Sequence, residues 1–174
     1  QVWAQAGNPL RVSEDLQVPI PPYLPDTAVA QRDVRQVYSN IVAMDEQVGQ
    51  IIEELEQDGL LESTVIFWYS DHGGPLPRQK RLLYDAGLQV PMIIRYPDKW
   101  RAGQLDDQLI SFVDFKSTAL SLAGIEPPEY VDGRAFAGEF QSSESRQYIH
   151  AAADRFDRQY DTIRAGRDER FKYL

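Results

Sequence analysis

The chain has 174 residues, of which 43% are hydrophobic, and this is enough to bury one core. A formal charge of -9 and a pI of about 4.7 argue against a surface that neutralises nucleic-acid phosphates or anionic lipid. We therefore expect neither nucleic acid nor a membrane among its partners. The chain also contains no cysteine, which excludes disulfides, a thiolate nucleophile and cysteine metal ligands within it.

The chain begins with a proline-rich stretch, residues 1–30, that predicts an extended connector, because proline fixes φ and lacks a backbone donor. The next segment, from about Asp33 to Gln57, predicts a long amphipathic helix that stops at Gly59. Its apolar side chains recur at spacings of three and four residues: Val34, Val37, Tyr38, Ile41, Met44, Val48, Ile51, Ile52 and Leu55.

Residues 64–69 are β-branched or aromatic and apolar on both faces, which predicts a central strand buried inside a parallel sheet. Residues 70–90 are polar and rich in Gly and Pro, and a loop of this length in a compact domain is usually functional. Residues 91–96 predict a second strand. The succession of helix, glycine turn and buried strand indicates an α/β fold.

The rest of the chain predicts shorter elements. Residues 110–113 predict a third strand, and Asp114 is placed to cap a helix that ends at Gly124. Residues 148–174 predict short antiparallel strands with a hairpin turn near Asp168. We therefore expect three parts: the connector 1–30, an α/β part at 31–140 and the start of a small antiparallel β subdomain at 141–174.

Asp71 and His72 directly follow the first predicted strand, where open α/β sheets bind their ligands. They offer a carboxylate oxygen and an imidazole nitrogen, and the two glycines that follow let the backbone bend so that both can face one cation. The same residues also fit a plain turn, in which Asp71 caps backbone amides and His72 lies at the surface. Two ligands do not complete a site for a calcium-like cation, which takes six or more.

The sequence beyond Asp71 extends the motif. It continues as His-Gly-Gly-Pro-Leu-Pro-Arg-Gln-Lys80, then Tyr84-Asp-Ala-Gly87, then Val90-Pro-Met-Ile-Ile-Arg95. In these residues the chain resembles the sulfatases of the alkaline phosphatase superfamily, and it looks closest to heparan sulfamidase-like and iduronate sulfatase-like polysaccharide sulfatases. The resemblance reaches from about Pro19 to the end of the chain.

This resemblance implies an alkaline-phosphatase-like sheet flanked by helices, and hydrolysis of sulfate esters or sulfamates of a sulfated glycan. The expected mechanism depends on formylglycine and Ca²⁺. Asp71 and His72 would bind the metal, although an imidazole ligand leaves another divalent metal open. Lys80 would bind the sulfate and its leaving oxygen, because fixed cations must hold the charge that builds up there. Arg81 takes this role if the alignment shifts by one residue.

The family's nucleophile motif, its pair of early aspartates and its catalytic histidine have no counterpart in this chain. We therefore expect the C-terminal part of a sulfatase, inactive without the N-terminal half of the same enzyme. His150 and Arg155 are candidate substrate contacts, because a histidine and an arginine close together can bind a sulfated sugar. By resemblance, the protein would be secreted, periplasmic or lysosomal.

Two alternatives stay open at this point. The first is a phosphodiesterase or phosphonate hydrolase of the same superfamily, since Asp-His-Gly after a buried strand recurs wherever this kind of sheet binds metal. The second is a binding module that keeps the fold without the chemistry. The surroundings of Lys80 favour sulfate over phosphate.

Overall fold

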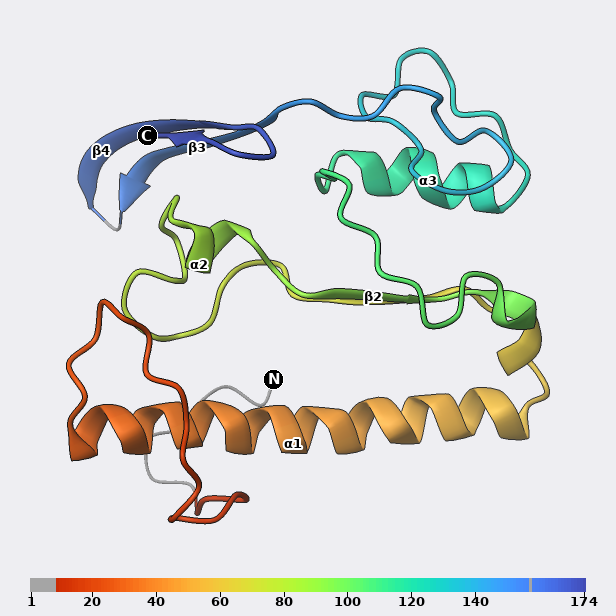
Figure 1. Ribbon diagram of the computed structural model, residues 1–174. Coiled ribbons are helices and arrows are strands. Elements are labelled where there is room, and N and C mark those ends of the chain that lie inside the picture. Colours follow the sequence, from red (N-terminus) through yellow and green to blue (C-terminus); the bar gives the residue numbers. More distant parts are fainter. Residues whose placement is uncertain (1–8, 157) are drawn as a thin grey trace. The chain divides into compact units, whose positions relative to one another are not determined.

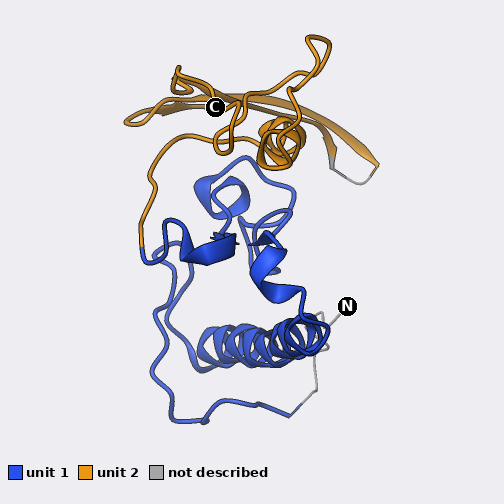
Figure 2. Cartoon of the chain, turned by 90° about the vertical axis from the view of Figure 1, so that its right-hand side faces the viewer, with its two compact units in different colours: residues 1–103 blue, residues 104–174 orange. Residues whose placement is uncertain are grey.

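The computed structural model describes residues 9–156 and 158–174. The chain divides into two compact units between Gly103 and Gln104 (Figure 2). The predicted boundaries at residues 30 and 140 stay predictions. Unit 1 contains α1 (Ala28–Gln57), β1 (Ile66–Tyr69), α2 (Asp85–Leu88) and β2 (Met92–Arg95), and unit 2 contains α3 (Asp114–Leu122), β3 (Ile149–Phe156), β4 (Gln159–Arg167) and β5 (Lys172–Tyr173) (Figure 1). Short 3-10 turns lie at Leu61–Ser63 and Pro97–Lys99.

Helix α1 confirms the long amphipathic helix and its stop. It begins five residues before the predicted Asp33, because the Thr27 hydroxyl accepts a hydrogen bond from the Ala30 amide at 3.2 Å and so caps the helix. It ends just before Gly59, whose φ of 69° is the left-handed conformation that closes many helices. None of the helices in the described residues is both long and apolar enough to cross a membrane.

The connector lies against α1, as far as the structure describes it; residues 1–8 lie outside the described part. No helix or strand forms in residues 9–27, as the prolines predict. The Arg11 amide donates to the Ser39 hydroxyl at 3.0 Å, and the Arg35 guanidinium donates to the Leu16 carbonyl at 2.7 Å. Val18 of the connector is buried, as are Val34 and Ala43 of α1.

Strand β1 forms where predicted but pairs differently. It runs antiparallel to β2, with Ile66 opposite Arg95 and Tyr69 opposite Met92, and in the described residues it has no second neighbour. The expected central position in a parallel sheet is therefore not observed, and its side chains are half-buried or exposed. Because antiparallel pairing brings the end of β1 beside the start of β2, both ends of the loop between them are held at one edge.

Helix α3 corrects two sequence predictions in unit 2. Residues 110–113 do not form a strand; residues 112 and 113 form a turn, closed by the Asp114 amide donating to the Ser111 carbonyl at 2.9 Å. Asp114 is the first helical residue, and its carboxylate accepts a hydrogen bond from the Ser111 amide instead of capping the helix amides. Gly124, at φ 71°, follows the helix end as predicted.

One face of α3 is buried against residues 133–142 and carries mainly hydroxyl side chains. Thr118 accepts from the Phe136 amide at 3.1 Å, and Ser121 accepts from the Phe140 amide at 2.8 Å. The spacing of the buried positions, Asp114, Ser117, Thr118 and Ser121, is that of a helix face, but the residues are polar. This face therefore binds the backbone of the segment through hydrogen bonds, beside the contact between the rings of Phe115 and Phe136.

Strands β3, β4 and β5 form an antiparallel sheet in that order, with an irregularity between Ala153 and Arg155. The predicted turn near Asp168 is confirmed: its carboxylate accepts from the Phe171 and Arg170 amides, and these bonds lower the pKa of Asp168. The mixed helix-and-strand fold, with its C-terminal antiparallel sheet, agrees with the predicted fold class.

Candidate active site

The loop between β1 and β2 folds back on itself through backbone contacts. The Gly73 amide donates to the Gly87 carbonyl at 3.0 Å, and the Lys80 amide donates to the Gly74 carbonyl at 3.1 Å. A Cβ atom on Gly73 would lie 1.9 Å from the Ala86 carbonyl oxygen, so only glycine allows this approach. The loop that carries the three predicted site residues of unit 1 is thus tied together at its base.

Asp71 and His72 lie side by side at the end of β1. The Ser70 hydroxyl donates to the His72 carbonyl at 2.5 Å, and His72 Nδ1 lies 2.7 Å from the Gly73 carbonyl oxygen. His72 Nε2 is 3.5 Å from Asp71 Oδ1. The Asp71 side chain is 76% exposed and that of His72 is 26% exposed, so the carboxylate projects into solvent while the imidazole is partly enclosed.

This geometry fits a pair of metal ligands. A carbonyl oxygen can only accept, so Nδ1 of His72 carries a proton in its bond to Gly73, and Nε2 is the ring atom that could bind a metal. The separation of 3.5 Å from Nε2 to the Asp71 carboxylate is longer than a normal hydrogen bond, and both atoms can bind one divalent cation. Residues 9–156 and 158–174 contain no third side chain grouped with them as a ligand.

Lys80 lies on the same loop, in a segment that side chains tie to the connector. The Gln79 amide nitrogen donates to the Tyr23 hydroxyl at 3.3 Å, and its amide oxygen accepts from the Leu76 backbone at 3.3 Å. Arg78 contacts two aromatic rings, with its guanidinium carbon 5.5 Å from the Tyr23 centroid and 5.6 Å from that of Tyr84. Sequence reasoning missed this cluster, because no local pattern indicates that Tyr23 lies beside the loop.

The other predicted contacts, His150 and Arg155, lie in unit 2 on β3. His150 lines an open groove of about 1130 Å³, which Arg155 does not line. The groove also contains two exposed aromatic side chains, Tyr148 and Phe171, and Arg170, whose guanidinium stacks over the Phe171 ring at 5.0 Å. The structure thus places His150 at a hollow large enough for a sugar residue.

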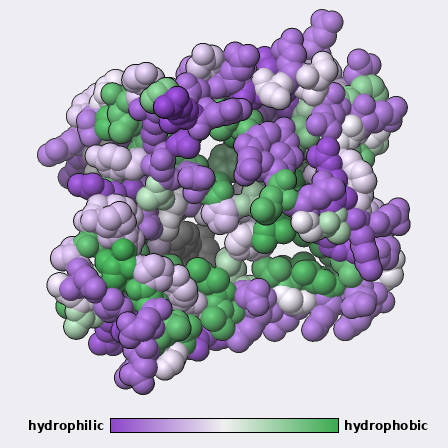
Figure 3. Space-filling model, viewed as in Figure 1, coloured by the Kyte–Doolittle hydropathy of each residue, from purple (hydrophilic) through white to green (hydrophobic). Residues whose placement is uncertain are grey.

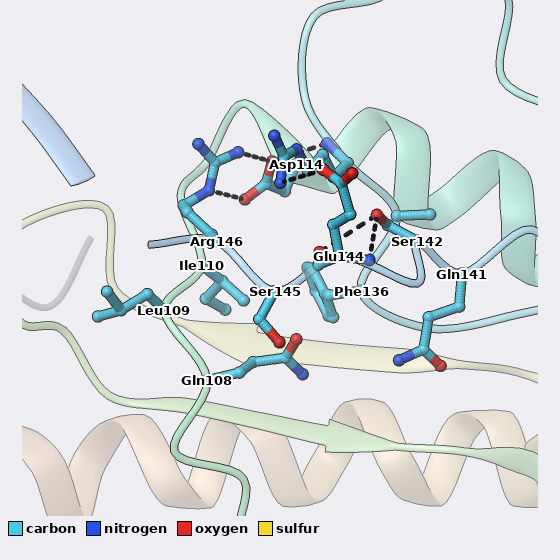
Figure 4. Close-up of a pocket in the computed structure, with 12 residues that line it drawn as sticks. Gln108, Leu109, Ile110, Asp114, Phe136, Gln141, Ser142, Glu144, Ser145 and Arg146 are labelled. Atoms are coloured by element: carbon cyan, nitrogen blue, oxygen red, sulfur yellow. Dashed lines mark hydrogen bonds and ion pairs between the residues drawn. The ribbon is translucent and has the colours of Figure 1, made fainter. Parts of the chain in front are cut away.

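A smaller hollow in unit 2, of about 50 Å³, lies beside Asp114 (Figure 4). Figure 4 shows the Arg146 guanidinium facing the Asp114 carboxylate, with which it forms an ion pair and two hydrogen bonds. A cavity of this size holds one or two water molecules and no sugar. The pair therefore serves the folding of unit 2.

Comparison with known proteins identifies the family. The sulfatase family model matches residues 9–125, a stretch that contains Asp71, His72 and Lys80. The chain belongs to the sulfatase family. It is 57% identical, over 171 residues, to an ulvan-active sulfatase of Formosa agariphila, and the match covers 98% of this chain and 28% of that protein. The chain thus spans under a third of the length of this sulfatase.

Solved structures support the same family fold. A protein solved in complex with its substrate, D-glucosamine-2-N,6-O-disulfate, matches with a TM-score of 0.65 at 25% identity, covering 86% of this chain and 33% of that one. A phosphonate monoester hydrolase from Silicibacter pomeroyi matches with a TM-score of 0.67 at 27% identity, covering 87% of this chain and 34% of that one. The sulfatase chain therefore shares its fold with an enzyme named for phosphorus chemistry.

Proposed function

We propose that the protein containing this chain hydrolyses sulfate esters or sulfamates of a sulfated glycan, with a formylglycine nucleophile that lies outside these 174 residues. The observation that carries the proposal is the sulfatase match over residues 9–125, which contain Asp71, His72 and Lys80. The glycan class rests on the 57% identity to an ulvan-active sulfatase. On family grounds, the protein acts in a secreted, periplasmic or lysosomal location.

Asp71 and His72 would hold a divalent metal, Ca²⁺ first, together with ligands from elsewhere in the enzyme. The support is the pairing of Asp71 Oδ1 and His72 Nε2 on one side of the loop, with the His72 tautomer fixed by the Gly73 carbonyl. When bound, the metal supplies positive charge beside the sulfate oxygens. The chain's own contribution is to hold two of its ligands in place.

Lys80 would oppose the negative charge that develops on the leaving oxygen. Its ammonium is a compact charge on a flexible stem, so it can follow this oxygen as the bond to sulfur breaks. Its backbone bond to Gly74 ties it to the segment that carries the metal ligands. Arg81, the fallback, follows directly and has a φ of 69°. His150 and Arg155 would contact the sugar from unit 2, and the groove at His150 supports this role for His150.

A specific observation favours one alternative, hydrolysis of a phosphonate or phosphate diester. It is the structural match to the phosphonate monoester hydrolase at a TM-score of 0.67. The two chemistries differ in the group that is attacked, so the enzyme should be assayed against matched aryl sulfate, aryl phosphonate and phosphodiester substrates. A preference for the sulfate by orders of magnitude in kcat/KM is expected.

The test of the proposal is Lys80→Ala in the complete enzyme. Removing one fixed group that opposes transition-state charge typically costs about a hundredfold or more in kcat. Arg81→Ala is the matched control, and we expect it to keep most of the activity. Steady-state kinetics in which Lys80→Ala loses less than tenfold would move the role to Arg81, if that variant is the inactive one, or remove it from this loop.

A further inference from the structure

Arg78 is held in place by two aromatic rings from different parts of unit 1. Its guanidinium carbon lies 5.5 Å from the centroid of Tyr23, in the connector, and 5.6 Å from that of Tyr84, which precedes α2. Stacking of this kind keeps an arginine in one orientation while leaving its edge donors available. The two contacts therefore favour one region for the guanidinium of Arg78.

The backbone around Arg78 is fixed as well. Arg78 has a φ of 63°, an uncommon conformation for a residue with a side chain, and one that its surroundings must maintain. Gln79 does so from both sides, since it bonds the Tyr23 hydroxyl and the Leu76 amide. The Arg78 side chain is thus oriented before any ligand arrives, which lowers the entropic cost of binding one.

Arg78 has no carboxylate partner among residues 9–156 and 158–174, and its contacts there are the two rings. The chain carries 27 acidic residues against 18 basic ones, so acidic partners are plentiful. Other arginines of the described chain do form ion pairs with carboxylates: Arg11, Arg95, Arg134, Arg146 and Arg164. Arg78 therefore presents an oriented, exposed and unneutralised guanidinium two residues from Lys80.

We propose that Arg78 binds a second anionic group of the substrate, a uronate carboxylate or a further sulfate, on a sugar whose reacting sulfate lies at Lys80. This rests on the proposed function. The planar fork of arginine matches both anions through two parallel hydrogen bonds, which the point charge of lysine cannot reproduce. Lys80 thus serves the reaction, and Arg78 selects substrates that carry more than one negative charge.

The experiment compares Arg78→Gln and Arg78→Lys with the parent in the complete enzyme. The substrates are a sulfated, uronate-containing oligosaccharide and an aryl sulfate that bears no other charge. Loss of a bidentate, charge-assisted contact should raise KM for the oligosaccharide about tenfold to a hundredfold, while kcat/KM for the aryl sulfate stays within about twofold. Arg78→Lys keeps the positive charge near the rings, so its failure to rescue would point to the fork itself.

Arg101→Gln is the matched control, because Arg101 also stacks on an aromatic ring of unit 1, Trp100, at 4.7 Å. Arg101 follows the end of β2 that lies away from the loop, so Arg101→Gln should leave KM and kcat unchanged with both substrates. Carboxyl-reduced and partly desulfated oligosaccharides tell the two sources of the anion apart. If Arg78 binds the carboxylate, the parent and Arg78→Gln should have the same KM for the carboxyl-reduced substrate. If Arg78 binds a sulfate, the two should have the same KM for the substrate that lacks that sulfate.

Two results would overturn the proposal. Equal losses on the oligosaccharide and the aryl sulfate would make Arg78 a structural tie of the loop. No loss on either would leave the guanidinium outside the substrate site. Isothermal titration of the oligosaccharide against Lys80→Ala, with and without Arg78→Gln, measures the contact without turnover. If Lys80→Ala stays fully active, the role proposed for Lys80 fails, yet a selective effect of Arg78→Gln on the KM of the oligosaccharide would still be visible.

Discussion

At the scale of single residues, burial decides how much an ion pair contributes to the free energy of unfolding, and unit 2 contains one buried and one exposed pair. The Asp114 side chain is 3% exposed, and its carboxylate accepts from the Ser111 amide, the Arg134 amide and the Arg146 guanidinium. The carboxylate of Asp154 pairs with Arg164, but the two side chains are 60% and 58% exposed. Only the first pair joins segments distant in sequence while shielded from water.

We expect Asp114→Ala to lower the free energy of unfolding by about 3 kcal/mol, because it leaves a partly buried guanidinium and two backbone amides without their acceptor. Asp154→Ala is the control and should cost at most about 1 kcal/mol, as exposed pairs do. Urea denaturation of the two variants measures both. Equal costs would mean that solvent screens the Asp114 pair as fully as the exposed one.

The sequence could not predict this pair, and the reason is separation along the chain. Asp114 and Arg146 are brought together only by the fold of residues 133–146, so no spacing rule applies to them. Asp71 and His72 were recognisable because they are adjacent and follow a strand, a local pattern. The same limit explains why Tyr23 was missed as a neighbour of the loop.

At the scale of elements, two glycines differ in how much space surrounds them: Gly73 in the loop between β1 and β2, and Gly49 in α1. A Cβ on Gly73 would lie 1.9 Å from the backbone oxygen of Ala86 and 2.8 Å from the Cα of Gly87, and neither atom can move without moving the loop. A Cβ on Gly49, inside α1, would meet no atom within 4 Å. The two glycines therefore have opposite roles.

Gly73→Ala should destabilise the protein by about 1–3 kcal/mol, as overpacking does, and should lower the activity of the complete enzyme by displacing His72. Gly49→Ala should stabilise it by about 0.5–1 kcal/mol, because alanine loses less backbone entropy in a helix. Thermal unfolding followed by circular dichroism ranks the two. A neutral Gly73→Ala would show that the loop can relax and that its tight base is not required.

Elements with local signals were predicted well, and pairings between elements were not. Periodicity and the Gly59 stop located α1, and the β-branched run located β1. The pairing of β1 with β2 is antiparallel although its apolar composition indicated a parallel sheet, because composition reports burial and not the direction of a neighbour. The buried face of α3 carries hydroxyl groups, so an apolar periodicity could not find it.

At the scale of the whole chain, α1 exposes apolar side chains that its described neighbours do not cover. Figure 3 shows apolar atoms at the surface of the α1 region, at the bottom of that view. The exposed positions on the helix include Tyr38, Ile41, Val42 and Ile51, with Ile51 at 58% exposure. Tyr38, Ile41 and Val42 lie at the spacing of one helix face, and exposed apolar side chains of this kind favour association with another apolar surface.

We predict that the isolated chain of 174 residues folds, self-associates and has no sulfatase activity. The exposed apolar side chains of α1 favour self-association. The described residues supply only the two proposed metal ligands, Asp71 and His72, where Ca²⁺ needs about six, so the affinity of the isolated chain for Ca²⁺ should be weak as well. Analytical ultracentrifugation measures the first property, and a sulfatase assay with Ca²⁺ present, beside the complete enzyme, measures the second.

The two parts of this prediction have separate controls. Ile41→Lys together with Ile51→Lys places charges at two of the exposed apolar positions of α1 and should restore a monomer; if the chain still associates, another surface is responsible. For activity, the decisive variant is Asp71→Ala. Specific turnover by the isolated chain, abolished by Asp71→Ala, would contradict the proposed function, because the nucleophile would then lie within these residues. Activity that survives Asp71→Ala would come from a contaminating enzyme or would contradict the metal-binding role proposed for this carboxylate, and a preparation of the Asp71→Ala chain purified by a second route tells these apart.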